Sequence, residues 1–564
     1  MLRPEVRMTR SRPVSRYLGI SLLAVSLAAA GCSTPQAQPQ APAAPDAPVT
    51  PKVNRVVLAT APPGVESNEP RQLAGQTSPQ LRPMYEHLVG MDPNSGKFTP
   101  QLATEWKMEG DGTSWRFKIR RGVQFHHGHG EFTSKDMVQP ILEYVRQDST
   151  GGWQGYWLRF YQAVETPSDD EVVFKLKERD GQFLQNVIEE RAGGSVFSKA
   201  DYASRGAESV KSVPYAGTGS YQFKERSQGQ HLRYERVPYK HWRTDAEFPE
   251  FEWRWMKEAS TRLAALLAGE VHSADLPEDL QPQAVKQGLK VVSGKFPSLR
   301  VFMNFYCCFL ADVKDPSKGL TDPSTPLRDV RVRRALSKAV NREELNKAFF
   351  AGKGSTMVLS HFSQTRQGWN PEWERRFPAY MGFDVAAARE LLAQAGYDNN
   401  NKLSTNLLIQ PVGGVPSAAD LTEAIAGYWR AIGVNVNLTQ MDPGELTNQT
   451  RQMRLTNHIN VLSTGTTQWG SSYAYVGATT TRGTKVEALE VNQPLDELQY
   501  IGDEKQQEDL WRKAGDAYFE SAGSIPLFWL PGEAVVNPSI VADWLLPGGV
   551  SGQWSHLQNI KAAR

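Results

Sequence analysis

Apolar and polar positions follow two distinct patterns along the chain from Val53 onward. Apolar runs, or apolar residues at every second position, predict strands at 53–61, 113–128, 169–178 and 299–306. Two further runs around Gln228 and Gly229 predict a hairpin within 217–242. Apolar residues at helical spacing predict helices within 329–352, 386–397, 421–441 and 506–530, with a strand after the helix in the last two. Strands interleaved with helices indicate an α/β architecture.

Local chemistry marks two of the helix boundaries. Thr133 and Asp136 have capping-box spacing, which predicts that a helix begins just before the segment MVQPILEYV. Pro140 lies inside that segment and is expected to kink the helix or to shift its start, because proline lacks the amide donor that a helix interior needs. Gly352 follows the helical pattern of 329–352 and predicts the end of a helix there.

The first 31 residues depart from this α/β pattern. Five arginines and one acid precede an apolar run at 18–30, which is the layout of a secretory signal peptide. The run is too short to span a bilayer, which takes about 20 residues. It ends in Ala28-Ala29-Ala30-Gly31-Cys32, which resembles a lipobox, although leucine is commoner at the position of Ala29. Cys32 is therefore predicted to be acylated and to become the mature N-terminus; a buried or disulfide-bonded thiol is the alternative.

Composition and charge narrow the class of protein further. Residues 33–52 are rich in Pro, Ala and Gln and predict an extended tether that buries no apolar surface. The 564 residues carry a formal charge of +2, and loss of residues 1–31 leaves a net charge near −2 because that segment holds five Arg and one Glu. Without a Lys/Arg-rich block, the chain offers no field that would hold nucleic acid.

No catalytic or cofactor motif stands out in the sequence. The patterns GxxxxGK[ST], HExxH and GxSxG are absent, as is a GxGxxG that opens a helix after a strand. We therefore predict that the protein is not an enzyme and needs no cofactor. His126, His127 and His129 could share a metal ion, but neighbouring residues of a strand point to opposite faces, so no metal site is predicted.

Two cysteines remain beyond Cys32, and they are adjacent. Cys307 and Cys308 follow the predicted strand 299–306. Adjacent residues of an extended strand point to opposite faces and bond only through a strained turn, so two packed thiols are expected; a vicinal disulfide acting as a redox switch is the alternative.

Several stretches, in fixed order, resemble one known family. They are residues 85–88 with 92–93, 100–106, 115–138, 217–221, 264–270, 326–336, 388–397 and 525–528. Their order and spacing are similar to the bacterial extracellular solute-binding proteins of family 5, the dipeptide, oligopeptide and nickel binders that serve ABC importers. The resemblance extends from about residue 53 to residue 528.

The resemblance implies an α/β, two-lobed periplasmic-binding-protein (Venus flytrap) fold with an extra small subdomain, hinged by crossing strands. After the signal peptide (1–31) and the lipidated tether (32–52), lobe I would cover 53–300 with the subdomain at about 80–215. Lobe II would cover 301–525, and residues 526–564 would return to lobe I. The hinges would lie near 298–304 and 525–530.

The resemblance also implies a function. Such a lipoprotein would capture oligopeptides or a related small solute by lobe closure and deliver them to a membrane permease whose ATPase is a separate subunit. We expect a monomer in the cell envelope, periplasmic or on the cell surface, and held to the membrane through Cys32. A sensory or adhesin lipoprotein of the same fold is the main alternative, and a secreted hydrolase is a weaker one.

The candidate ligand site follows from the same resemblance. In the family, a segment with Trp followed by Asp lines the cleft, and 466–475 corresponds to it here. The predicted ligand-binding residues are Trp469, Ser471, Ser472, Tyr473, Tyr475, Asn304 and Tyr306. Aromatic rings among small hydroxyl residues suit stacking and neutral hydrogen bonds, although a core tryptophan with serine-rich turns would look the same. Peptide binders of the family carry an Asp where Ser472 and Tyr473 stand, so the ligand's amine is held elsewhere or is absent.

Overall fold

The computed structural model describes most of the chain after residue 49. The described residues are 50–63, 65–73, 78–92, 97–109, 112–151, 153–187, 193–312, 315–364, 366–410, 412, 414–415, 417–441, 443–465, 486–498, 500–544 and 556–564. The predictions for the signal peptide, for Cys32 and for the pocket segment 466–475 lie outside these residues, as does nearly all of the tether.

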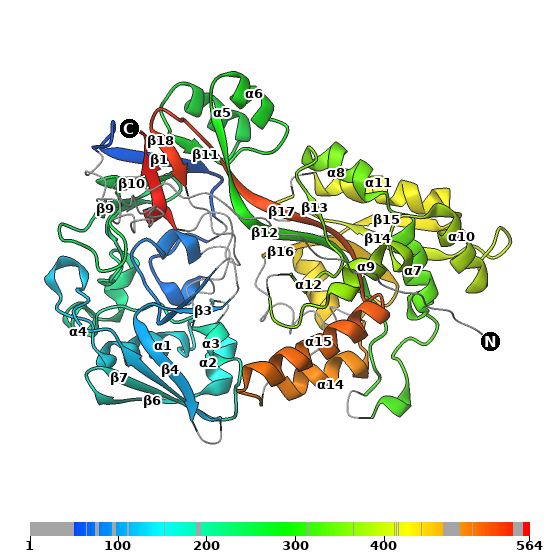
Figure 1. The fold of residues 1–564 in the computed structure, drawn as a ribbon, viewed down its shortest axis with the longest axis horizontal. Coiled ribbons are helices and arrows are strands. Elements are labelled where there is room, and N and C mark those ends of the chain that lie inside the picture. The colour runs from blue at the N-terminus through cyan, green and yellow to red at the C-terminus, as the bar shows by residue number, and fades with distance from the viewer. Residues whose placement is uncertain are drawn as a thin grey trace, which may run out of the picture. The chain divides into compact units, whose positions relative to one another are not determined.

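One mixed sheet of eleven strands runs through the described part of the fold (Figure 1). Its order is β15 (Asn435–Gln440), β14 (Ser404–Ile409), β16 (His458–Gly465), β12 (Lys290–Tyr306), β17 (Ser524–Val536), β11 (Ser273–Ala274), β1 (Arg55–Thr60), β10 (Glu250–Trp255), β9 (His231–Arg236) and β8 (Tyr221–Ser227), with β13 (Ser355–Thr356) also on β17. The strands beside β12 (β16, β14 and β15) come from residues 404–465. The strands beside β17 on the other side (β11, β1, β10, β9 and β8) come from residues 55–274.

The strands β12 and β17 join these two sets of strands. They pair antiparallel from Lys290 opposite Val536 to Asn304 opposite Ser524. β12 also pairs with β16 from Leu299 onward, and β17 also pairs with β11 at Val535 and Val536. The predicted strand at 299–306 is thus the end of a strand that begins nine residues earlier, because pairing with β17 extends the ladder past Pro297.

A separate four-stranded antiparallel sheet carries its own core. Its order is β4 (Ala103–Glu109), β5 (Ser114–Ile119), β7 (Glu171–Leu176) and β6 (Tyr161–Ser168). Helices α1 (Val138–Tyr144), α2 (Gln154–Phe160) and α3 (Phe183–Asn186) pack against it, so that Phe117, Trp157 and Phe183 are fully buried together. Short strand pairs complete the set: β2 (Val89–Met91) with β3 (Phe98–Pro100), and β18 (Val541–Trp544) with β19 (Ile560–Ala562).

The other helices lie against the large sheet or against one another. Their bounds are α4 (Lys199–Arg205), α5 (Ala259–Leu267), α6 (Gln281–Lys286), α7 (Val330–Lys338), α8 (Arg342–Phe350), α9 (Pro371–Tyr380), α10 (Val385–Gln394), α11 (Ala418–Ala431), α12 (Pro443–Arg451), α14 (Leu489–Leu498) and α15 (Glu504–Glu520). One core joins α7, α8, α10 and α11 to β12 and β14–β17, and a second joins α9, α14 and α15.

Most of the local predictions are confirmed. β1 and β7 lie within the strands predicted at 53–61 and 169–178, and β8 and β9 form the predicted hairpin. Thr133 and Asp136 make the reciprocal bonds of a capping box at the start of a 3-10 turn, Ser134–Met137, that leads into α1. Pro140 lies in the first turn of α1, where its missing donor costs little.

Two predicted elements are shorter or divided in the structure. The helical pattern of 329–352 forms α7 and α8 instead of one helix, because the Asn341 side chain accepts from the amide of Glu344 and caps a new helix start. The strand predicted at 113–128 ends as β5 at Ile119, and residues 126–128 form a 3-10 turn in which His127 has a φ of 56°.

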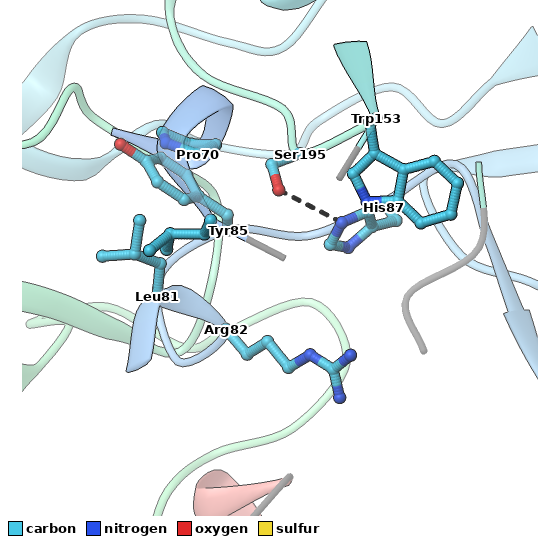
Figure 2. Close-up of a pocket in the computed structure, with 8 residues that line it drawn as sticks. Pro70, Leu81, Arg82, Tyr85, His87, Trp153 and Ser195 are labelled. Atoms are coloured by element: carbon cyan, nitrogen blue, oxygen red, sulfur yellow. Dashed lines mark hydrogen bonds between the residues drawn. The ribbon is translucent and has the colours of Figure 1, made fainter. Parts of the chain in front are cut away.

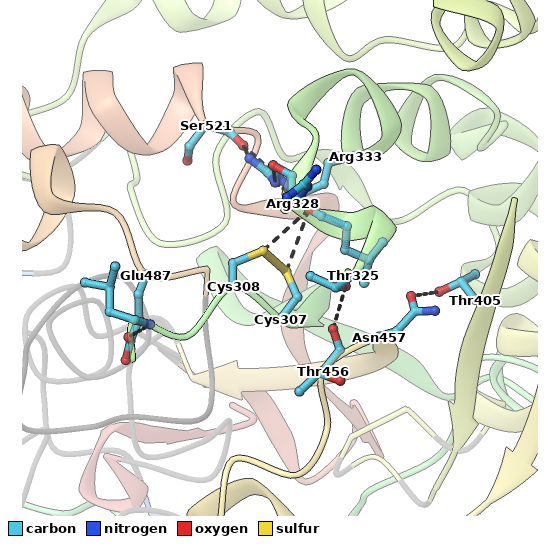
Figure 3. The surroundings of a disulfide bond; sticks show 12 residues. Cys307, Cys308, Thr325, Arg328, Arg333, Thr405, Thr456, Asn457, Glu487 and Ser521 are labelled. Carbon is cyan, nitrogen blue, oxygen red and sulfur yellow. Dashed lines mark hydrogen bonds between the residues drawn. A yellow bond between two sulfur atoms is a disulfide. The ribbon is translucent and has the colours of Figure 1, made fainter. Parts of the chain in front are cut away.

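The expectation of two free thiols is wrong, because Cys307 and Cys308 form a disulfide in the structure (Figure 3). β12 ends at Tyr306, and Cys308 has a left-handed φ of 64°. The premise of an extended strand therefore fails at these two residues, since the turn brings both sulfur atoms to the same side. Both cysteines are buried in the core that α7 and α11 cover.

Candidate functional site

The candidate site is built on β12, whose side chains alternate between two faces of the sheet. Val301, Met303 and Phe305 are fully buried in the core beneath α7 and α11. The opposite face carries Arg300, Phe302, Asn304 and Tyr306, since successive side chains of a strand point to opposite sides. Of the residues predicted to bind ligand, Asn304 and Tyr306 are the two within the described part of the chain.

The structure places Asn304 at the meeting of three strands. It lies opposite Asn460 of β16 and opposite Ser524 of β17, and its side chain is buried. Asn460 is buried as well and shares its face of the sheet with Asn304. The two carboxamides lie on the same buried face, and within the described residues no hydrogen bond is formed by Nδ2 of Asn304 or by either polar atom of the Asn460 side chain.

Tyr306 occupies a different environment from the one predicted. Its ring packs with Leu408, Leu446 and Leu455 in a small apolar cluster, and 3% of the residue is exposed. In this conformation Tyr306 supports the packing of α12 on the sheet, so its assignment as a ligand contact stays a prediction.

A buried polar group that the sequence analysis missed lies at the start of the same face. Arg300 is 1% exposed, and its guanidinium donates to the hydroxyl of Thr464 and to the carbonyl of Ser360, the latter at 3.4 Å. Thr464 stands two residues before the predicted pocket segment. The sequence feature that could have indicated this buried polar group is a charged residue between Leu299 and Val301, in an otherwise apolar run.

His361 completes this polar group. It is fully buried between Phe302 of β12, with ring centroids 4.9 Å apart, and Tyr518 of α15. Burial, together with the positive charge of Arg300, lowers the pKa of His361 well below its usual value. The imidazole is therefore neutral at physiological pH, and the positive charge of the group belongs to Arg300.

A second polar cluster gathers residues that carry the family resemblance. Glu86 is buried, accepts from the indole of Trp242 at 2.8 Å and forms an ion pair with Arg243, whose Nη2 lies 3.1 Å from Oε1. Burial alone would raise the pKa of Glu86, but Arg243, His241 and Trp242 together lower it. His241 in turn contacts the Thr218 carbonyl at 2.8 Å. The cluster ties Glu86 to two segments, around Thr218 and around Trp242, that lie more than 100 residues further along the chain, so its role is structural.

The ring centroids of His126 and His127 lie 6.3 Å apart, but the three histidines near residue 126 have different partners in the structure. His126 is buried, contacts the Gly219 carbonyl at 2.8 Å through its Nε2 and has a pKa lowered by burial to about 3. His127 adopts the left-handed conformation, and His129 instead lies 3.6 Å from Asp201. Within the described residues, no group of three His, Cys, Asp or Glu side chains is arranged to hold a metal ion.

A small cavity beside these segments is shown in Figure 2. It measures about 10 Å³ and is lined by Pro70, Leu73, Leu81, Arg82, Tyr85, His87, Trp153 and Ser195. The hydroxyl of Ser195 lies 3.2 Å from Nε2 of His87. A cavity of this size holds about one water molecule, so it is a packing feature and not a solute site.

No helix in the described part of the chain combines the length and apolar character needed to cross a bilayer. The two clusters of buried charge described above lie around Arg300 on β12 and around Glu86. The first borders the segment predicted to line a cleft, and the second is remote from it in sequence.

Sequence comparisons identify the relatives of the chain. Residues 97–485 match the model for bacterial extracellular solute-binding proteins, family 5 Middle. The chain is 25% identical over 384 residues to the dipeptide-binding protein of Escherichia coli (strain K12), which covers 64% of this chain and 67% of that protein. It is 26% identical over 377 residues to heme-binding protein A of Haemophilus influenzae, covering 63% and 64%.

Solved structures show the same fold. The periplasmic binding protein DppA from Helicobacter pylori, in complex with the peptide STSA, superposes with a TM-score of 0.67 at 20% identity. The superposition covers 90% of this chain and 98% of that one. The chain therefore has the two-lobed periplasmic-binding-protein fold, which confirms the expected fold class.

Proposed function

Since the chain belongs to the bacterial extracellular solute-binding proteins of family 5, we propose that it is the binding component of an ABC importer for oligopeptides or a related small solute. In this role the chain would bind the solute, and separate permease and ATPase subunits would transport it. Binding without catalysis agrees with the lack of enzyme motifs in the sequence. The observation that carries the proposal is the match of residues 97–485 to the family, together with the two-lobed fold of the whole described chain.

The strands β12 and β17 support closure as the mechanism. They pair with each other, and each also pairs with a different half of the sheet. Register shifts in this ladder fall between Ser293 and Leu299 and between Val301 and Phe302. Two strands can bend where their pairing is interrupted, while the hydrogen-bonded ladders on either side stay intact. The lobes could thus rotate about these strands, and a ligand that binds both lobes would favour the closed state.

The proposed domain division follows from these strands. Lobe I comprises residues 53 to about 300 with the return segment 526–564, and it includes the small subdomain built on the four-stranded sheet. Lobe II comprises residues 301–525. The separate cores around β1 with β8–β10, around β5 with β7, and around β12 with α7 and α11 support a division into three packing units.

Direct binding tests the function. The mature protein would be titrated calorimetrically with a panel of synthetic di- to pentapeptides, each with a free and an N-acetylated amine, and with heme. We expect at least one peptide to bind and N-acetylation to cost less than about tenfold, because Ser472 and Tyr473 replace the acid that would pair with an α-amine. Trp469→Ala is expected to cost more than acetylation, since stacking would carry recognition.

The control is Trp429→Phe, a buried tryptophan in the core beneath α11, which should leave affinity unchanged. A hundredfold loss on acetylation would place a carboxylate in the cleft and contradict the neutral-site prediction. Binding of heme but of no peptide would assign the solute to another class, and no binding of either would argue against the peptide proposal itself.

Membrane attachment through Cys32 is the second part of the proposal. The apolar run, Cys32 and the tether predict an acylated N-terminus. Several acyl chains anchor a protein stably whereas one binds marginally, so wild-type protein should stay with membranes in high salt. Cys32→Ala is expected to release it or leave it unprocessed, as shown by fractionation and intact-mass measurement. Equal membrane retention of wild type and Cys32→Ala would refute lipid anchoring.

A further inference from the structure

The lobes also touch at a point far from β12 and β17. Gln507 near the start of α15 is 8% exposed, and its Nε2 donates to the carbonyl of Gly181 at 3.2 Å. The same amide donates to the carbonyl of Ile501 at 2.7 Å, which holds the side chain in place. Gly181 lies between β7 and α3 in the small subdomain, 326 residues from its partner. Figure 1 shows α14 and α15 running toward α3 and the four-stranded sheet.

A close packing contact accompanies this hydrogen bond. Gly502, in the turn between α14 and α15, faces the side chain of Met108 on β4 so closely that a Cβ there would lie 2.0 Å from the methionine methyl carbon. The backbone of Gly502 does not have a left-handed φ, so its conformation does not require glycine. The absence of a side chain instead lets Met108 approach closely. Met108 itself packs on the core of the small subdomain.

Hydrogen bonds hold the chain beside Gly502 and beside Gly181. The Asp503 side chain accepts from the amide of Gln506 at 2.9 Å and fixes the start of α15 beside Gly502. On the other side, Asp180 next to Gly181 is buried, and its carbonyl accepts from the indole of Trp115 at 2.9 Å. The Asp180 carboxylate accepts from the Tyr156 hydroxyl at 2.5 Å. Rigid partners lose little conformational entropy when they meet.

We propose that Gly502 and Gln507 of lobe II and Met108 and Gly181 of the small subdomain form a clasp that must open whenever the lobes separate. The chain crosses between the lobes through β12 and β17, so rotation about those strands moves the two sides of the clasp apart. A buried hydrogen bond and a close packing contact then set the rate at which the lobes open. The effect of the clasp on ligand release, unlike its effect on the lobes themselves, rests on the proposed function.

Two substitutions, one that adds a side chain at the contact and one that makes room for it, test the clasp. Gly502→Leu places a side chain where Met108 lies, and Met108→Ala makes room for it. Small-angle X-ray scattering of the unliganded mature protein should give a larger radius of gyration for Gly502→Leu than for wild type, and the double variant should return to the wild-type value. Gly427→Ala, on the helix α11 where an added Cβ meets nothing, is the matched control and should match wild type.

Equal scattering of wild type and Gly502→Leu would overturn the clasp. So would an increase that Met108→Ala fails to reverse, because it would indicate general disruption. In the second arm, Gln507→Met should speed dissociation of the tightest-binding panel peptide about tenfold in stopped-flow measurements, with the association rate unchanged. An unchanged dissociation rate would contradict a role in release. If no peptide binds wild type, the proposed function fails while the scattering result still decides the clasp.

Discussion

Gly217→Ala is expected to destabilise the first lobe strongly. A Cβ at this position would lie 2.0 Å from the backbone carbonyl of Met84 and 2.8 Å from the ring of Tyr85. The carbonyl of Gly217 meanwhile accepts from the amide of His126 at 2.9 Å, so its own backbone is held as well. Neither backbone can move away, and we expect the free energy of unfolding to fall by at least about 3 kcal/mol.

Urea unfolding of the mature protein measures this loss through the transition midpoint. Gly155→Ala is the matched control: Gly155 lies on α2 in the same lobe, and an added Cβ meets no atom within 4 Å. Alanine in a helix is more favourable than glycine by up to about 1 kcal/mol, so this variant should be slightly more stable than wild type. Equal stability of Gly217→Ala and wild type would show that the segment 83–85 yields, against our expectation.

The second large effect is a loss of stability between pH 7 and pH 5. Burial lowers the pKa of His126 to about 3 and that of His361 well below its usual value. The unfolded chain takes up a proton at each histidine below about pH 6.5, whereas the folded chain does not. The unfolded state therefore binds more protons as the pH falls, and stability falls with it. At pH 5 His126 removes about 2 kcal/mol, and His361 acts in the same direction.

One buried acid acts in the opposite direction. Burial raises the pKa of Asp180 to about 6, so the folded state takes up this proton before the unfolded state does and gains about 1 kcal/mol between pH 6 and pH 5. The loss from His126 alone exceeds this gain, and His361 adds to it, so the three groups together lower stability between pH 7 and pH 5.

Urea midpoints measured as a function of pH test the sign and the assignment. His126→Gln keeps a donor for the Gly219 carbonyl but does not titrate, so its stability should fall less steeply than that of wild type, by about 1.4 kcal/mol per pH unit below pH 6. Parallel curves for the two proteins would contradict a neutral, buried His126. Gly155→Ala, which changes no titratable group, should run parallel to wild type.

The local elements and the family were determined by the sequence itself. The apolar run in 169–178, the capping box at Thr133 and the hairpin around Gly229 each depend on residues within a few positions of one another. Side-chain periodicity and capping act over such distances, so they can be predicted without knowledge of the fold. The order of eight short stretches likewise identified the family that the match of residues 97–485 confirms.

Only the tertiary structure decided where these elements end and what their polar residues do. β12 extends back to Lys290 because β17 lies beside it, and the turn at Cys308 lets two adjacent cysteines bond. Glu86 meets Trp242 across 156 positions, and Gly181 meets Gln507 across 326. The pKa of a buried group and the space beside a glycine depend on atoms brought in from such distances, and no local pattern of residues records them.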